Sequence, residues 1–202
     1  MRVFYSYQKD QIPDRAGIYS FYYNPYNYHG LGLYKDRKIS EQDLKRSKSA
    51  LRKKLHLLQF LKLSLKADIS VKLSAPSGTS VAEFNSLASA NLIAIDDDIA
   101  NLSADEFIEL LELANNSIHT FPIIYCGITI EQTLRDRYIQ HYSNFKTGQN
   151  ATFGGRVGKF SLDWHDLAFS CVPSGSLVGF RSAALRLERQ IINFSVPLLS
   201  NR

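Results

Sequence analysis

Three short runs of β-branched and aromatic residues, each bounded by turn residues, stand out along the chain. They cover residues 18–23, 121–127 and 167–172. Pro13-Asp14 precedes the first run and Asn24-Pro25 follows it, and the second run ends at Gly127. Runs of this length and composition are typical of buried strands. The pattern therefore predicts strands that share one small sheet.

Leucines at helical spacing predict a long helix from Ser40 to about Lys66. They recur at intervals of seven, four, three and seven residues, at Leu44, Leu51, Leu55, Leu58 and Leu65. Ser40 with Asp43 three residues later resembles a capping box. Ser80 to Glu83 and Ser103 to Glu106 have the same signature. We therefore expect 24–120 to be a mainly helical insertion.

Two further helices are predicted outside this insertion. One runs from Ile130 to about Phe145, with Thr129 as its cap, and the other from Arg181 to Phe194, before Pro197. The order outside the insertion is then strand, strand, helix, strand, helix. This order predicts the α+β class, with helices packed on a sheet.

Composition excludes several protein classes. The chain has 202 residues, of which 45% are hydrophobic and 21% charged, which excludes a disordered tail or a coiled-coil rod. His56, Gln59 and Lys62 interrupt the longest apolar stretch, so we expect no membrane span. The first thirty residues lack the pattern of a signal peptide, and two cysteines are too few for a disulfide framework. These features predict a cytoplasmic protein.

The 24 basic and 19 acidic residues are segregated along the chain. Basic residues crowd the first half of the predicted long helix, at Lys45, Arg46, Lys48, Arg52 and Lys53. A second group surrounds the glycine-rich segment 154–158, at Lys146, Arg156 and Lys159. Such residues contact phosphate backbones in nucleic-acid-binding proteins, but charge alone also fits a solvated surface. Both interpretations remain open at this point.

Three motifs carry a resemblance to a known family. They are Gly17-Ile18-Tyr19, then Tyr125-Cys126-Gly127, and then Arg137 four residues before His141. Glu188 follows in the last predicted helix, with Pro197 and Asn201 after it. In this order they resemble the GIY-YIG nuclease superfamily. The resemblance covers about 105 residues and implies a nuclease core of 1–23 and 121–202, built on a three-stranded antiparallel sheet flanked by helices.

The resemblance implies a catalytic set of five residues: Tyr19, Tyr125, Arg137, His141 and Glu188. Their chemistry suits hydrolysis of a phosphodiester. A guanidinium can hold phosphate oxygens, and an imidazole one helical turn away can relay a proton. One carboxylate leaves the other ligand positions to water and phosphate, which suits Mg²⁺, with Mn²⁺ as a substitute. Either tyrosine could act as the base.

Each of these residues also has an ordinary structural interpretation. A tyrosine at the end of a strand is more often part of the core, and Arg137 could form a surface ion pair. His141 could be an exposed polar residue, and Glu188 an ordinary glutamate on a helix surface. Trp164 could contact a base, although a tryptophan that pins a loop to the core is the more common case.

The chain is similar to the stand-alone restriction endonucleases of this superfamily, which implies a type II restriction enzyme from a prokaryote or phage. Its substrate would be double-stranded DNA, with target recognition or dimerisation in 24–120. Cutting both strands of a palindromic site would call for a homodimer. The alternatives are a structure-selective repair or mobile-element nuclease, and a DNA-binding module that does not cleave.

Overall fold

The computed structural model describes residues 2–34, 39–70, 98–121 and 123–174, together with 183, 185–187, 189, 190 and 199. The chain forms two compact units. The first, here called the sheet unit, comprises Met1–Asn24 and Ser117–Arg202. The second, the helical unit, comprises Pro25–Asn116.

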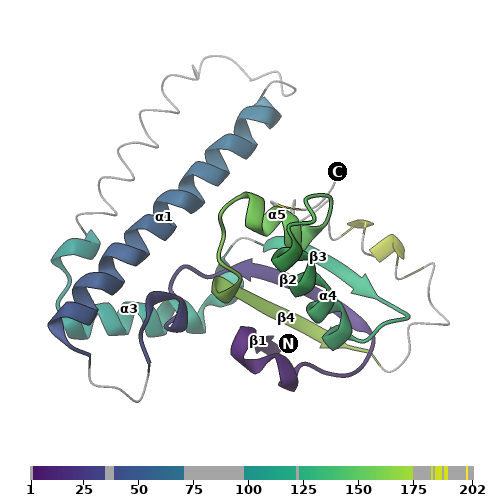
Figure 1. Cartoon of the computed structure of the whole chain (residues 1–202), viewed down its shortest axis with the longest axis horizontal. Coiled ribbons are helices and arrows are strands. Elements are labelled where there is room, and N and C mark those ends of the chain that lie inside the picture. Colours follow the sequence, from purple (N-terminus) through teal and green to yellow (C-terminus); the bar gives the residue numbers. More distant parts are fainter. Residues whose placement is uncertain are drawn as a thin grey trace. The chain divides into compact units, whose positions relative to one another are not determined.

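The sheet unit is built on four antiparallel strands in the order β1-β4-β2-β3 (Figure 1). Their bounds are Arg2–Phe4 for β1, Gly17–Tyr23 for β2, Ile123–Thr129 for β3 and Leu167–Pro173 for β4. The α+β class and the three expected strands are confirmed. The expected number of strands is wrong, because β1 joins the edge of the sheet beside β4. A strand of three residues is too short to show a periodic pattern.

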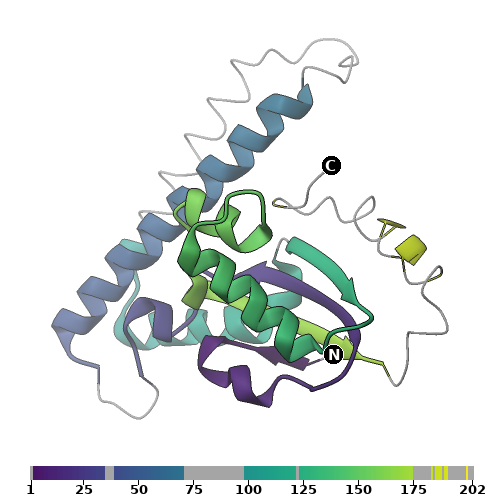
Figure 2. The same cartoon turned by 45° about the vertical axis from the view of Figure 1, so that its right-hand side comes forward.

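Two helices, α4 (Leu134–Thr147) and α5 (Phe153–Lys159), cover one face of this sheet (Figures 1 and 2). A capping box between Thr133 and Asp136 starts α4, and Gly148 ends it with a φ of 66°. The predicted cap at Thr129 is therefore wrong by one turn. Thr129 belongs to β3, and its hydroxyl donates to the Gln132 carbonyl at 2.7 Å.

The glycine-rich segment after α4 is helical, although glycine has a low helix propensity. Gly154 and Gly155 lie in the first turn of α5, where they face the C-terminal half of α4 and the loop after it. A β-carbon on Gly154 would lie 2.1 Å from the His141 carbonyl oxygen. These glycines therefore let α5 pack directly on α4.

Aromatic rings fill the space between the sheet and the two helices. Phe21 is fully buried and packs on Phe153 at 4.8 Å and on Phe169 at 5.0 Å between ring centroids. Trp164 is 1% exposed, and its indole nitrogen donates to the Tyr138 hydroxyl at 2.8 Å. The expectation that this tryptophan pins a loop to the core is confirmed.

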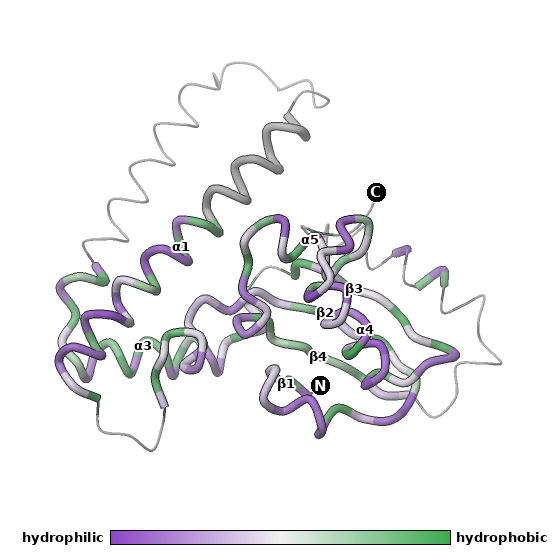
Figure 3. The backbone as a smooth tube through the Cα atoms, viewed as in Figure 1, coloured by the Kyte–Doolittle hydropathy of each residue, from purple (hydrophilic) through white to green (hydrophobic). Residues whose placement is uncertain are grey.

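The helical unit contains α1 (Glu41–Ser70) and α3 (Ala104–Asn116). Ser40 and Asp43 form the expected capping box of α1, and Ser103 and Glu106 form that of α3. Apolar and polar positions alternate along the first half of α1 (Figure 3). Its leucine stripe packs on α3 and the preceding loop, with Leu44, Leu51 and Leu55 in one cluster with Phe107 and Leu111.

Short 3-10 helices link these elements: η1 (Ser6–Gln11), η2 (His29–Leu31), η3 (Ile118–Thr120) and η4 (Trp164–Asp166). Residues 98–101 are helical, as are residues 183, 185–187, 189 and 190 of the last predicted helix. The predicted cap from Ser80 to Glu83 lies outside the described residues. Within the described part of the chain, no helix combines the length and apolar character needed to cross a bilayer.

Candidate functional site

Two neighbouring strands place the two motif tyrosines on one face of the sheet. In the antiparallel register of β2 and β3, Tyr19 lies opposite Gly127 and Tyr125 lies opposite Phe21. Opposed residues share a face, and positions two apart along a strand share it too. Tyr19 and Tyr125 therefore project to the same side, where their ring centroids are 6.1 Å apart.

Packing explains the glycine in each of the two tripeptides. A β-carbon on Gly127 would lie 2.7 Å from the Tyr19 hydroxyl oxygen and 2.9 Å from its Cζ atom. A β-carbon on Gly17 would lie 2.4 Å from the Val172 carbonyl oxygen. Gly127 therefore gives the phenol ring of Tyr19 room to cross β3, and Gly17 lets β4 approach β2 closely.

The Tyr19 hydroxyl is the centre of a hydrogen-bonded cluster. Arg137 Nε donates to it at 3.1 Å, and His141 Nε2 lies 3.0 Å from it. Tyr19 is 1% exposed, and burial raises its pKa above the usual value; the neighbouring Tyr125 raises it further, whereas the charge of Arg137 lowers it. The phenol therefore keeps its proton in the free protein at neutral pH.

His141 comes from the same helix as Arg137, one turn later, and it is 4% exposed. This burial excludes the interpretation of His141 as an ordinary surface residue. Burial, and then the positive charges of Arg137 and Arg156, lower the pKa of His141 to about 3. The imidazole is therefore neutral at pH 7.

One nitrogen of this imidazole lacks a partner. His141 Nδ1 is buried and makes no hydrogen bond with any described residue. An unsatisfied buried polar atom costs about 1–3 kcal/mol. Atoms of this kind are uncommon in native structures. The orphaned nitrogen therefore marks a position where a further group can complete the site.

Arg137 is half-buried and lies near both tyrosines. It donates to the Tyr19 hydroxyl, and its Nη1 atom donates to Gln140 Oε1 at 2.5 Å. Burial favours the neutral form of the guanidinium, but the two tyrosines outweigh this effect and raise the pKa of Arg137. The site therefore contains a permanent positive charge beside a neutral imidazole.

The structure adds two residues of α5 to the site. The ring of Phe153 stacks on Tyr125, with centroids 4.4 Å apart and an interplanar angle of 18°. Arg156 is close enough for its charge to act on both His141 and Tyr125. The sequence placed Arg156 among DNA contacts and gave Phe153 no role. A helix through 153–159 would have put both residues on one face, but the glycine pair concealed that helix.

Arg156 also binds Leu199 close to this site. Its Nε atom donates to the Leu199 carbonyl at 3.0 Å, and its Nη1 atom donates to the Ala151 carbonyl at 3.0 Å. The Leu199 amide in turn donates to the Ile124 carbonyl at 2.7 Å, next to Tyr125. The guanidinium of Arg156 thus connects α5 to Leu199, which is itself hydrogen-bonded to β3.

Glu188 and Asn201 lie outside the described residues. The groups that the structure brings together are two phenols, an imidazole and two guanidiniums. Mg²⁺ prefers oxygen ligands, carboxylates above all. Within the described part of the chain, no cluster of three or more acidic, histidine or cysteine side chains offers a ready metal site.

The basic residues predicted to contact DNA have different environments. Lys45, Arg46 and Lys53 are exposed and line a shallow hollow on α1. Lys48 instead donates to the carbonyls of Ala100 and Leu102, which places its amine inside the helical unit.

The remaining members of that set are Arg52, Lys146 and Lys159. Arg52 is half-buried, and Lys159 is exposed at the end of α5. The amine of Lys146 lies 5.6 Å from the centroid of the Tyr142 ring. Lys146 and Lys159 therefore belong to the sheet unit, whereas Arg52 belongs to the helical unit.

Comparison with protein-family models, with curated proteins and with solved structures finds no match for this chain. The geometry of the site indicates which chemistry its side chains can perform. A fixed guanidinium can bind an anionic oxygen, and a neutral imidazole can accept a proton. A phenol held between them can pass a proton from one side to the other.

Proposed function

We propose that this protein is a DNA endonuclease of the GIY-YIG type, which hydrolyses phosphodiester bonds with Mg²⁺ or Mn²⁺. The observation that carries the proposal is the Tyr19 hydroxyl, bound at once to Arg137 and His141 beside Tyr125. This cluster unites four of the five residues that the motifs select. Hydrogen-bond donors around an anionic oxygen and a base beside a water are what phosphodiester hydrolysis requires.

Each side chain of the cluster has a separate role in the proposed reaction. Arg137 binds a non-bridging phosphate oxygen, which fixes the scissile group and stabilises its developing charge. Tyr19 accepts the proton of the attacking water as it passes its own proton to His141 Nε2. A divalent ion held by Glu188 would supply further neutralisation of charge and a more acidic water.

Substrate binding prepares His141 for its role. In the free protein, burial and two neighbouring arginines hold its pKa at about 3. A bound phosphodiester adds negative charge beside these arginines and offsets their effect. The pKa of His141 therefore rises in the complex, and the imidazole becomes a better proton acceptor where the reaction occurs.

The expected biological role is restriction. In that role the helical unit would contribute target recognition or dimerisation, and a second copy of the chain would cut the second strand. A structure-selective nuclease of repair or of a mobile element would use the same site on branched DNA.

Incubation of the full chain with supercoiled plasmid and Mg²⁺ tests the proposal and separates these roles. Discrete linear products support restriction, whereas cleavage confined to branched DNA supports repair. Binding without cleavage in either Mg²⁺ or Mn²⁺ would contradict the nuclease assignment and leave a binding module.

A pair of matched variants tests the carboxylate. Glu188→Gln should abolish cleavage, because it removes the only ligand assigned to the ion. Glu109→Gln makes the same change at an exposed position of α3 and should cleave normally. Unchanged cleavage by Glu188→Gln would show that the metal assignment is wrong.

A further inference from the structure

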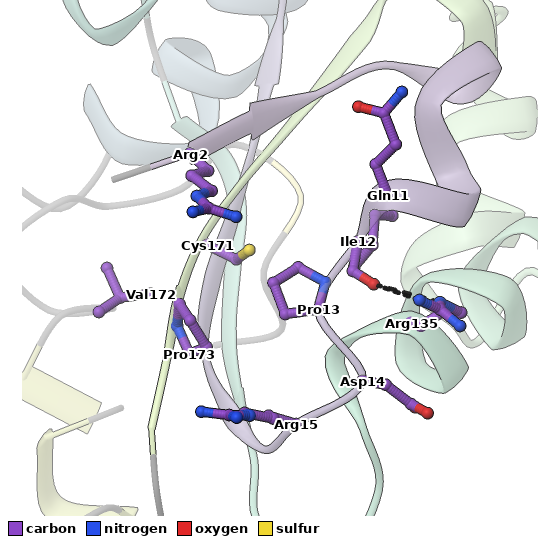
Figure 4. A pocket seen from close by; sticks show the side chains of 10 residues that line it. All are labelled: Arg2, Gln11, Ile12, Pro13, Asp14, Arg15, Arg135, Cys171, Val172 and Pro173. Atoms are coloured by element: carbon purple, nitrogen blue, oxygen red, sulfur yellow. Dashed lines mark hydrogen bonds between the residues drawn. The ribbon is translucent and has the colours of Figure 1, made fainter.

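A second feature of the sheet unit is a cavity of about 530 Å³ beside β1, η1 and the end of β4 (Figure 4). Three arginines line it: Arg2, Arg15 and Arg135. Asp14 is the single carboxylate among its lining residues. The lining therefore carries an excess of two positive charges, which favours an anionic ligand.

Hydrogen bonds fix one of these arginines in advance. Arg135 donates to the Ile12 carbonyl through Nε at 3.1 Å and through Nη2 at 3.0 Å, and Nη2 also reaches the Asp10 carbonyl at 3.1 Å. Figure 4 shows the guanidinium held against the backbone of this loop. It is therefore oriented before any ligand binds, which lowers the entropic cost of binding.

The guanidiniums of the other two arginines have no partner among the described residues. Arg2 and Arg15 are exposed, and neither guanidinium forms a hydrogen bond or ion pair with a residue in the described ranges. The backbone carbonyl of Arg15 accepts from the Leu134 amide at 2.8 Å. Planar guanidiniums with free donors are well suited to bind phosphate oxygens in pairs. The cavity thus presents two free guanidiniums together with one that is already positioned.

Apolar residues line the cavity as well. They are Pro13, Val172 and Pro173, and Val172 is 49% exposed. Cavities of about 300–1,000 Å³ with apolar walls and a few polar groups are typical of small-ligand sites. A nucleotide matches this division, because its base is apolar on both faces and its phosphate is anionic.

The sheet register places one arginine of this cavity on the same face of the sheet as Tyr19. Arg2 lies opposite Cys171, and Cys171 lies opposite Tyr19 in the next strand. All three residues therefore share one face of the sheet. Two strand spacings, or about 10 Å, separate the backbones of β1 and β2. The ring of Tyr19 crosses Gly127 of β3, away from β1, so a nucleotide in the cavity and a phosphate at the Tyr19 hydroxyl would be separated by more than this spacing.

We propose that this cavity binds a nucleotide, with Arg2, Arg15 and Arg135 on its phosphate and Pro13, Val172 and Pro173 against its base. The nucleotide is either free or part of a DNA strand. The second source rests on the proposed nuclease function, whereas the first is independent of it.

Calorimetric titration of the full chain in EDTA tests this proposal without any need for cleavage. The probes are inorganic phosphate, an equimolar mixture of the four deoxynucleoside 5′-monophosphates, and a short single-stranded oligonucleotide. The double variant Arg2→Gln/Arg15→Gln should bind the monophosphates at least about tenfold more weakly, because it loses two charge-assisted contacts. Lys9→Gln, a change of the same charge type outside the lining, should bind them normally.

The probes separate the two sources and the possible failures. If the oligonucleotide binds more tightly than the monophosphates, and the double variant loses this binding, the source is a DNA strand. If the monophosphates bind more tightly than the oligonucleotide, the source is a free nucleotide. Equal affinity for inorganic phosphate and monophosphates would contradict a base contact and overturn the nucleotide assignment. Unchanged binding by the double variant, or no binding to the wild-type chain at about 10 mM ligand, would overturn it as well. A chain that never cleaves DNA but binds nucleotides would refute only the nuclease proposal.

Discussion

A single hydroxyl group, that of Tyr19, connects Arg137 and His141 in the candidate catalytic site. It accepts a hydrogen bond from Arg137, lies 3.0 Å from His141, and belongs to a ring that crosses Gly127. The same ring packs on Phe169 with a centroid separation of 5.5 Å. Removing the hydroxyl while keeping the ring therefore separates its chemistry from its packing.

Tyr19→Phe should fold and lose at least about a hundredfold in the rate of DNA cleavage, because the proton path and the Arg137 contact both need the hydroxyl. Tyr138→Phe is the matched control. It also removes a buried hydroxyl, the one that accepts from Trp164, but outside the cluster. Thermal unfolding should show similar losses of stability in both variants. Cleavage assays should show a loss of activity in Tyr19→Phe alone. Equal cleavage rates for the two variants would remove Tyr19 from the mechanism.

His141 predicts a pH dependence of stability. Its folded pKa of about 3 lies below the ordinary value of 6.5, so the unfolded chain binds more protons between these two values. The contribution of His141 to stability is therefore complete above pH 6.5 and is lost as the pH falls towards 3. His141→Gln should flatten the fall in the free energy of unfolding over this range, measured by urea denaturation at several pH values.

Arg156 contributes to this low pKa, together with burial and Arg137. Tyr19, Tyr125 and Phe153 also face the ring. Arg156→Gln should raise the pKa of His141, measured by NMR titration of the ring, because one of two positive charges is removed. Lys159→Gln, at an exposed position of the same helix, should leave it unchanged. A pKa of His141 that is the same in both variants would contradict this electrostatic coupling.

The sequence predicts which reactive side chains belong to the site better than it predicts the surroundings of those side chains. The expectation that the two tyrosines lie near Arg137 and His141 came from the resemblance to the GIY-YIG superfamily, since each residue alone has an ordinary structural interpretation. Burial of His141 follows from its place on the same helix face as Leu134 and Tyr138. The part played by Arg156 was not predictable, since it depends on tertiary packing that no local pattern records.

At the scale of elements, the contact between α4 and α5 positions the site. Gly154 lies against the His141 carbonyl, so a side chain there would push α5 away from the residue that it helps to bury. Phe153 and Arg156, which belong to the same helix, would move with it.

Gly154→Ala should therefore destabilise the fold by about 1–3 kcal/mol or more. Gly158→Ala is its control, because a β-carbon there would meet the nearest atoms of Phe145 at 3.6 Å, an ordinary contact. That change should be neutral or stabilise the helix by up to about 1 kcal/mol. Chemical denaturation measures both. Similar stabilities for the two variants would contradict the close packing of α4 on α5.

Strong local sequence patterns predicted most of the helices and strands. The elements that were not predicted have weak or conflicting sequence patterns. The two capping boxes of α1 and α3 and the leucine stripe agree with one another, so both helices were predictable. β1 has three residues, and the first turn of α5 contains two glycines with low helix propensity. In both cases contacts with the rest of the sheet unit decide the structure.

The whole molecule consists of a sheet unit, which contains the cluster around Tyr19, and a helical unit with exposed basic residues on α1. Lys45, Arg46 and Lys53 are exposed along one side of α1, with Lys45 and Lys53 eight residues apart. Residues seven or eight apart lie about two turns from each other on one side of a helix, and together they can follow a phosphate backbone.

The triple variant Lys45→Gln/Arg46→Gln/Lys53→Gln should bind duplex DNA more weakly. The slope of log K against log salt concentration should fall in magnitude by up to about 3, since each lost phosphate contact removes close to one counterion. Lys54→Gln is the control, because the amine of Lys54 donates to the Gly30 carbonyl at 2.7 Å. It should alter stability without altering the slope. An unchanged slope in the triple variant would show that this surface does not contact DNA.

The single-turnover rate of DNA scission in Mg²⁺ tests the central claim most directly, measured for the wild-type chain, Arg137→Gln, His141→Gln and the double variant. If the cluster acts as one catalytic unit, each single variant loses at least about a hundredfold and the double variant loses little more than the worse of the two. Scission that is absent from the wild-type chain, or equally fast in the double variant, would contradict the account.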